Sequence, residues 1–265
     1  MISSPENDAI HTTPAITVHG LVNRFGAQWI HDDLDLEVMR GEILGVIGGS
    51  GTGKSVLLRT IVGLNRPLQG DIRILGERLS ALRGSARKAV LARVGVLFQS
   101  GALFSGLTVV ENIALVLKSH TSLRPERIDL LARQKIDMVG LPQDAAEKLP
   151  TKLSGGMRKR AGLARALALD PEIVFLDEPT AGLDPIGASD FDSLILELQQ
   201  SLKLTVFMVT HDLDSLVAIT DRIAVLVDNK IRIGSLEELL NDPHPWIQEY
   251  FHGPRARATR HAIAG

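Results

Sequence analysis

Hydrophobic and polar residues alternate at the start of the chain. Ile16 and Val18 share one face of this alternation, and the pattern repeats over residues 34–38. A period of two predicts half-buried antiparallel strands, the second of which ends near Gly41. The polar, proline-containing residues 1–15 are predicted to form a flexible leader.

Continuous apolar runs of strand length replace the alternation further along the chain. They occupy residues 42–47, 94–98, 173–176 and 204–209. Runs of this kind are typical of strands buried on both faces, as in a parallel sheet. Between the last two runs, apolar residues recur at helical spacing and predict a crossover helix that completes a βαβ unit. These residues are Phe191, Leu194, Ile195, Leu198 and Leu202.

Helical segments separate these strands. An apolar helix is predicted from Lys54, and residues 71–75 predict one more strand. The basic stretch 77–93 is interpreted as a solvated helix face. Residues 109–149 lack strand signals, so we expect an inserted helical subdomain over about 100–165.

The C-terminal part shows a turn, a helix start and a tail. Asp228 and Asn229 stand between two short apolar runs and predict a two-residue hairpin turn. Ser235 and Glu238 form a capping-box pattern that predicts one more helix. The following NDPHP ends that helix, and residues 241–265 are predicted as a tail. Its three arginines have two interpretations: a frayed basic end, which is favoured slightly, or a segment that reaches a partner subunit or anionic lipid.

Composition excludes several classes of protein. The chain has 265 residues, of which 45% are hydrophobic and 23% charged, so it can bury a core and is not mainly disordered. Lysine and arginine number 29 against 31 acidic residues, giving a net charge of -2. We therefore expect no nucleic-acid partner. Cysteine is absent, which excludes disulfides and cysteine-ligated metal centres.

Membrane insertion is not expected from this sequence. The apolar runs are far shorter than the roughly 18–20 residues that a spanning helix needs. The N-terminus carries Glu6 and Asp8 and no basic residue, unlike a secretory signal. Any membrane role is therefore expected to depend on a partner.

A glycine-rich loop supplies the first candidate chemistry. Residues 48–55 read GGSGTGKS, the pattern G-x-x-x-x-G-K-[ST], between an apolar strand and an apolar helix. Small residues let main-chain N–H groups surround a phosphate, and the helix N-terminus favours the same anion. Lys54 can lie between the β- and γ-phosphates of ATP, and the Ser55 hydroxyl can bind Mg²⁺. The candidate ATP-binding residues are Gly48, Gly49, Ser50, Gly51, Thr52, Gly53, Lys54 and Ser55.

Two acids end the buried strand IVFLDE, at positions 177 and 178. Ligands bind beyond the carboxyl ends of strands in such sheets, so both acids are expected to face the phosphate loop. Asp177 is suited to direct or water-mediated contact with Mg²⁺. Glu178 is suited to act as the general base or to orient the attacking water.

One stretch indicates which family of phosphate-loop ATPases the chain resembles. Residues 153–184 read LSGGMRKRAGLARALALDPEIVFLDEPTAGLD. This stretch resembles the signature, Walker B and D-loop of ATP-binding cassette (ABC) ATPases. Gln99 is similar to the Q-loop residue of that family and His211 to its switch histidine. The order and spacing match over about 16–240, which we therefore expect to be one ABC ATPase domain.

The resemblance implies a fold, a dimer and residue roles. The fold is an α/β phosphate-loop NTPase with a mixed, mostly parallel core sheet, an N-terminal antiparallel subdomain and an inserted helical subdomain. Ser154, Gly155 and Gly156 form a second anion site at a helix start, which one chain cannot aim at its own γ-phosphate. Two copies would pair head to tail, each signature completing the other's site, with Asp184 at the seam. His211 would contact the γ-phosphate, and Gln99 would join Asp177 and Ser55 around Mg²⁺.

Two positions depart from the usual family pattern. The signature usually continues with Gln where this chain has Met157, which cannot return the reciprocal bond of a capping box. We expect an altered helix start without loss of activity. Phe25 takes the place of the aromatic residue, usually Tyr, that stacks on adenine. Its alternative interpretation is an ordinary aromatic residue of the β subdomain.

The residues after Gln99 read SGALFSGLTVVENIALVLKSHTSL. Together with LSGGMRKR (153–160) and PTAGLDPI (179–186), they resemble the ATPase subunit of Mla-type transporters (maintenance of lipid asymmetry). That implies phospholipid transport between the inner and outer membranes, from the cytoplasmic face of the bacterial inner membrane. It also implies a separate permease, an MCE-domain lipid-binding subunit and a STAS-domain protein. Leu103, Phe104 and Leu107 would contact the permease, or else pack inside the helical subdomain.

Two alternatives remain open. The first is a transport ATPase for an amino acid or an organic solvent, because the cargo contacts the permease. The second is a non-transport ABC protein. Its DNA-repair form needs a long heptad insertion, and its translation form needs two cassettes, neither of which this sequence contains.

Overall fold

A computed structural model describes residues 13–253 of the chain. The chain divides into two compact units, residues 1–82 with 207–265 and residues 83–206. Strand β8 (Thr205–Val209) contains the second junction between them. Both units combine helices with strands, which confirms the predicted α/β class.

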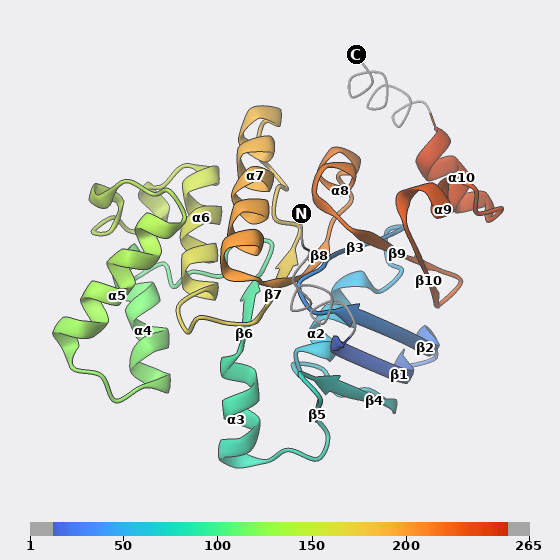
Figure 1. The fold of residues 1–265 in the computed structure, drawn as a ribbon, viewed down its shortest axis with the longest axis horizontal. Helices are drawn as coiled ribbons and strands as arrows, with labels where there is room; N and C mark the ends of the chain where they lie inside the picture. Colours follow the sequence, from blue (N-terminus) through green and yellow to red (C-terminus); the bar gives the residue numbers. More distant parts are fainter. Residues whose placement is uncertain (1–12, 254–265) are drawn as a thin grey trace, which may run out of the picture. The chain divides into compact units, whose positions relative to one another are not determined.

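The first unit begins with the antiparallel sheet that the alternating pattern predicts. Its strands are β1 (Pro14–Phe25), β2 (Gln28–Met39), β4 (Gln69–Ile74) and β5 (Glu77–Arg78), in the order β2-β1-β4-β5 (Figure 1). Ile16 and Val18 are fully buried. The strand starts at Pro14, inside the predicted leader, and buries Ala15 as well. Residues 1–12 of that leader lie outside the described residues.

A mixed sheet completes the strands of the first unit. β3 (Ile43–Gly48) runs parallel to β9 (Arg222–Val227), and β9 pairs antiparallel with β10 (Lys230–Gly234). Thr210, just after β8, donates its main-chain N–H to the carbonyl of Val46 over 3.2 Å, so β8 ends beside β3. Asp228 and Asn229 have φ angles of 51° and 60°, which confirms the predicted hairpin turn.

The described residues of this unit also form the helices α2 (Lys54–Ile61), α8 (Leu213–Ile219), α9 (Leu236–Leu240) and α10 (Pro245–His252). The predicted capping box at α9 is confirmed. Its Glu238 main-chain N–H donates to the Ser235 hydroxyl over 3.2 Å, and the Ser235 N–H donates to the Glu238 carboxylate over 2.7 Å.

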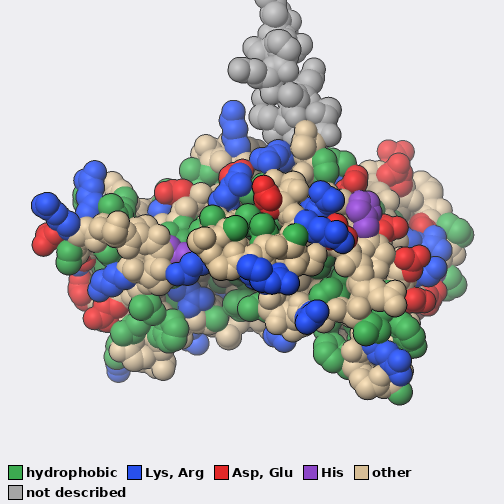
Figure 2. Space-filling view, turned by 90° about the horizontal axis from the view of Figure 1, so that it is seen from below, with side chains coloured by type: hydrophobic (Ala, Val, Ile, Leu, Met, Phe, Trp, Pro, Cys, Tyr) green, Lys and Arg blue, Asp and Glu red, His purple; other side chains and the backbone are tan. Residues whose placement is uncertain are grey.

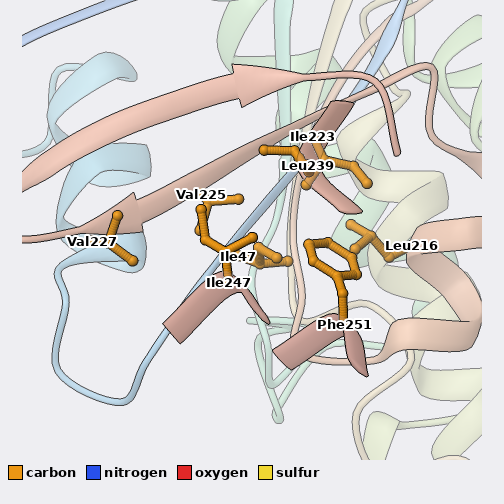
Figure 3. Packing of buried hydrophobic residues seen from close by; sticks show 8 residues of the cluster. All are labelled: Ile47, Leu216, Ile223, Val225, Val227, Leu239, Ile247 and Phe251. Atoms are coloured by element: carbon orange, nitrogen blue, oxygen red, sulfur yellow. The ribbon is translucent and has the colours of Figure 1, made fainter. Parts of the chain in front are cut away.

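Helix α10 lies in the stretch that the sequence analysis assigned to a tail. Its Ile247 and Phe251 are 0% and 1% exposed, and they join a core cluster that contains Ile47 and Leu216 (Figure 3). Burial of each such side chain is worth about 1.5–3 kcal/mol, enough to hold a short helix in place. The three arginines of the predicted tail lie in residues 254–265, outside the described part of the chain.

The second unit contains two strands and most of the longer helices. Its elements are α3 (Gly84–Ala92), β6 (Val94–Leu97), α4 (Val109–His120), α5 (Pro125–Met138), η1 (Gln143–Ala145), η2 (Pro150–Lys152), α6 (Gly155–Ala166), β7 (Ile173–Asp177) and α7 (Pro185–Leu202). β6 and β7 are parallel, with Leu97 opposite Leu176. Helices α4, α5 and α6 pack on one another (Figure 1).

Two expectations for this unit can be compared with the structure. Every residue of 109–149 is described and none lies in a strand, as predicted. The compact unit, residues 83–206, is larger than the predicted insertion of about 100–165, because β6, β7 and α7 belong to it. Of the predicted apolar stripe on α7, Leu202 is 42% exposed, since it is the last helical residue before the left-handed Lys203.

One face of the molecule mixes both signs of charge. Lysine and arginine side chains are interspersed with acidic and apolar ones on the face shown in Figure 2. Among residues 13–253, we find no helix with the length and apolar character that crossing a membrane would require.

Candidate nucleotide-binding site

The loop between β3 and α2 has a conformation that requires glycine at two positions. Gly48 and Gly53 have φ angles of 156° and 98°. A Cβ on Gly48 would stand 2.6 Å from the carbonyl oxygen of Leu226, and one on Gly53 would stand 2.3 Å from Cγ2 of Ile30. The loop therefore packs main chain against its neighbours too closely for any side chain at these positions.

The side chain of Lys54 is bonded to the main chain of this loop. Its Nζ atom donates hydrogen bonds to the carbonyl oxygens of Gly48 (2.7 Å) and Gly49 (3.0 Å). Helix α2 begins after Gly53, which provides no side-chain cap for its first N–H groups. Ser55 follows in the first helical turn. An ammonium, the N–H groups of a helix N-terminus and a hydroxyl form a donor set that fits the phosphates and Mg²⁺ of a nucleotide.

A buried network of polar side chains packs against the phosphate loop at Gly53. His31 is 0% exposed, and its Nδ1 lies 3.0 Å from the Asn23 amide nitrogen, which also donates to Thr60 Oγ1 over 3.2 Å. On its other side, Nε2 of His31 lies 2.8 Å from the position that a Cβ on Gly53 would occupy. Burial lowers the pKa of His31 to about 4, against a smaller opposing effect of the Gly53 main chain.

This histidine makes stability depend on pH. Its folded-state pKa of about 4 lies below the ordinary 6.5, so the unfolded chain binds the proton more tightly. Stability from the neutral ring is complete above pH 6.5 and is lost as pH falls toward 4. We expect the free energy of unfolding to fall by about 2 kcal/mol more between pH 7 and 5 in the parent than in His31→Gln.

Urea unfolding at the two pH values measures this difference. His19→Gln, which removes an exposed histidine from β1, is the control. Equal pH dependence in the parent and His31→Gln would show that the buried ring is not the group responsible.

His211 lies near the phosphate loop in the topology of the first unit. It is exposed, two residues beyond β8, and β8 ends beside β3, which leads into the loop. Tyr250 of α10 donates its hydroxyl proton to the main-chain carbonyl of His211 over 3.3 Å and stacks on Trp246 at 5.0 Å between ring centroids. The Trp246 Nε1 atom lies 3.5 Å from where a Cβ on Gly49 would stand.

The α10 aromatics therefore lie beside both segments, although only a tail was expected here from the sequence. The spacing of Trp246, Ile247, Tyr250 and Phe251 on one helical face was the available signal.

The second unit places three candidate residues at the carboxyl ends of its parallel strands. Gln99 follows β6 by two residues, Asp177 ends β7 and Glu178 comes next. Asp177 is 5% exposed, whereas Gln99 is exposed. Glu178 has a φ of 52°, a left-handed conformation that is unusual for a residue with a side chain. Because β6 and β7 pair in register, their ends lie at the same edge.

Ser154 begins α6 as predicted. Its hydroxyl accepts a hydrogen bond from the main-chain N–H of Met157 over 3.2 Å. The side chain at 157 returns no bond to the Ser154 main chain, in contrast to the reciprocal capping boxes that begin α4 and α9. Ser154 and Gly155 are exposed and Gly156 is partly buried, so the helix start is accessible.

The remaining two candidates lie on the surface. Asp184 begins α7, and its carboxylate accepts the N–H of Gly187 over 2.9 Å. Phe25 ends β1 and is 57% exposed, as an aromatic residue available for stacking would be. The first unit thus contains Phe25, the phosphate loop and His211, and the second contains the carboxylates, Gln99 and the signature.

Comparison with known proteins agrees with this geometry. The ABC transporter family model matches residues 31–181. The chain is 40% identical to the intermembrane phospholipid transport system ATP-binding protein MlaF of Escherichia coli, over 86% of this chain and 85% of that protein. It is 38% identical to the probable ribonucleotide transport ATP-binding protein mkl of Mycobacterium leprae, over 91% of this chain and 70% of that protein.

A solved structure shares the fold. The dimeric post-hydrolysis state of the ATP-binding cassette MJ0796 bound to ADP and Pi superposes with a TM-score of 0.76 at 28% identity, covering 83% of this chain and 98% of that chain. Fold and site together define a phosphate-loop ATPase of the ATP-binding cassette class. The chain belongs to the ABC transporter family, and it binds and hydrolyses ATP with Mg²⁺.

Proposed function

We propose that this chain is the ATPase subunit of a transporter that moves phospholipid between the inner and outer membranes through a separate permease. The observation that carries the ATPase assignment is the Lys54 ammonium, held by two carbonyls of the phosphate loop at the uncapped start of α2. The phospholipid assignment is supported by 40% identity to a phospholipid transport ATPase over most of both chains.

Each candidate residue has a proposed role in hydrolysis. The phosphate loop binds the phosphates, with Lys54 at the β- and γ-phosphates. Ser55, Gln99 and Asp177 hold Mg²⁺, which neutralises charge on the phosphate oxygens when bound. Glu178 orients the attacking water and accepts its proton.

Two further contacts complete the proposed nucleotide site. His211 donates a hydrogen bond to the γ-phosphate. Phe25 stacks on adenine, which requires only an exposed ring face.

We further propose that two copies of the chain form the working ATPase. Ser154, Gly155 and Gly156 present an accessible helix start suited to an anion, and in the dimer they would contact the nucleotide bound by the other copy. Asp184 would lie at the seam. The solved relative MJ0796 is dimeric, which supports the same arrangement here.

The proposed cargo and accessory partners rest on resemblance to known transport ATPases. Their names differ, one specifying phospholipid and the other ribonucleotide transport. The stretch after Gln99 resembles the Mla type, so we favour phospholipid, with an MCE-domain subunit and a STAS-domain protein as partners. The subunit would then be peripheral to the cytoplasmic face of the inner membrane.

The experiment for the cargo is purification of the tagged chain from its native membranes. We expect a permease and an MCE-domain protein to co-purify, with phospholipid identified by mass spectrometry of the complex. A complex that instead contains an amino-acid or nucleotide permease without phospholipid would assign the chain to another transporter.

The proposed permease contact lies near an apolar hollow of the second unit. Phe104 is 55% exposed, and Leu103 and Leu107 are partly buried. Phe104 also lines a cavity of about 430 Å³ together with Phe98 and Leu115. Exposed aromatic anchors beside a hollow are typical of protein contact sites.

Replacing Leu103 and Phe104 together by Ala tests this contact. Loss of the anchors should cost at least about 2 kcal/mol of binding, roughly a 30-fold loss of permease from the purified complex. ATP hydrolysis by the isolated subunit should stay within about twofold of the parent. Leu202→Ala, which removes another exposed leucine, is the control. An intact complex in the double variant would show that the permease binds to another part of the chain.

A further inference from the structure

Lys159 is a buried cation to which the nucleotide-site motifs assign no role. It lies on α6, five residues after Ser154, and only 6% of its surface is exposed. Lysine is rarely buried without a partner, because its ammonium loses hydration. Its Nζ atom donates a hydrogen bond of 2.6 Å to the main-chain carbonyl of Glu178.

The carbonyl that accepts this bond belongs to a strained residue. Glu178 follows β7 immediately and has a φ of 52°. Such conformations cost on the order of 1–3 kcal/mol and persist only where the surroundings hold them. The same carbonyl accepts the main-chain N–H of Ala181 over 3.3 Å. The bond from Lys159 thus ties the main chain of Glu178 to a residue of α6 that lies 19 positions earlier in the chain.

Lys159 also lines a small cavity within the second unit. The cavity measures about 160 Å³, and Gln99, Gly155 and Gly182 are among its other lining residues. These residues belong to the Q-loop, the signature and the D-loop segments. Lys159 thus lies where three motif segments of one unit meet.

Burial and the nearby carboxylates act in opposite directions on the pKa of Lys159, and burial has the larger effect. Burial lowers the pKa of the ammonium, while the carboxylates of Glu178 and Asp177 act in the opposite direction and favour its charged form. A charged donor makes a stronger hydrogen bond to a carbonyl than a neutral one.

We propose that Lys159 is a positioning residue for ATP hydrolysis, because its hydrogen bond from α6 fixes the main chain of Glu178 and so aims the Glu178 carboxylate. The inference rests on the role of Glu178 in the proposed function. It adds a residue that contacts no nucleotide but sets where the water-orienting group stands.

The bond from Lys159 also connects the start of α6, which would contact the other copy's nucleotide, with Glu178. Lys159 lies about 7.5 Å along the helix axis from Ser154, at 1.5 Å per residue. The start of α6 would contact the nucleotide of the other copy, whereas Glu178 acts on the nucleotide of its own chain. A displacement of α6 would therefore be transmitted to the main chain of Glu178 through the Lys159 side chain.

Lys159→Met tests the proposal in the full chain, because it removes the donor and keeps the apolar stem. A misplaced catalytic group costs up to about 100-fold in rate, so we expect kcat to fall 10- to 100-fold. The KM for ATP and the Tm should change little, and Lys159→Arg, which keeps a charged donor, should recover most of the rate. Lys88→Met, an exposed lysine on α3, is the control. If Lys159→Met does not fold, Lys159→Gln replaces it, with an expected intermediate loss of kcat.

The outcomes separate this inference from the proposed function. If Glu178→Gln abolishes turnover and Lys159→Met hydrolyses ATP like the parent, the positioning role is wrong and the proposed function stands. If Glu178→Gln itself turns over normally, the assignment of Glu178 fails first. A rise in KM with unchanged kcat, or a loss that Lys159→Arg does not recover, also contradicts the positioning role.

Discussion

Glu178→Gln is expected to lower kcat for ATP hydrolysis by about 10²- to 10⁴-fold, the usual contribution of a general base. The amide keeps the size of the side chain, and its main chain can keep the left-handed conformation of the parent. ATP affinity should therefore stay within about threefold. Because ATP is bound and not consumed, the variant should accumulate as a dimer with Mg²⁺ and ATP.

Steady-state turnover, equilibrium ATP binding and light scattering measure the three parts of this result. Glu197→Gln, on an exposed position of α7, controls for the loss of one carboxylate. Parent-like turnover in Glu178→Gln would show that Glu178 is not the general base of ATP hydrolysis.

Lys54→Ala is expected to abolish nucleotide-dependent work by a different route. The variant loses a charged donor at the phosphates and two hydrogen bonds to carbonyls of the loop. The loss of charge-assisted contacts costs at least about 2 kcal/mol, so ATP affinity should fall by at least roughly 30-fold. Hydrolysis should fall below detection at millimolar ATP.

Calorimetric titration with a slowly hydrolysed ATP analogue separates binding from chemistry. Lys88→Ala should bind the analogue like the parent, because Lys88 is an exposed side chain on α3. Normal turnover in Lys54→Ala would overturn the phosphate-loop assignment.

Much of the fold could be predicted from the sequence because local signals agreed with the final packing. The alternation around Ile16 became β1, and the dipeptide Asp228–Asn229 became the turn between β9 and β10. The capping box at Ser235 began α9 as expected. In each case a few neighbouring residues determine the local conformation, so one sequence is enough to recognise it.

The positions that the sequence did not reveal depend on contacts between distant segments. Helix α10 begins at the second proline of the NDPHP stretch, from which a tail was expected, but burial of Phe251 holds it in place. His31 occupies a position in β2 that reads as an ordinary strand residue, and only the fold brings it under Gly53. Lys159 reads as one more cation in a basic helix until α6 is placed beside the end of β7.

The most direct test of the whole account is a structure of Glu178→Gln with Mg²⁺ and ATP. We expect two copies in head-to-tail contact, with the γ-phosphate at Lys54 of one copy and Ser154 of the other within hydrogen-bond distance of it. A γ-phosphate enclosed by one copy alone, with Ser154 of the second copy elsewhere, would contradict the proposed mechanism.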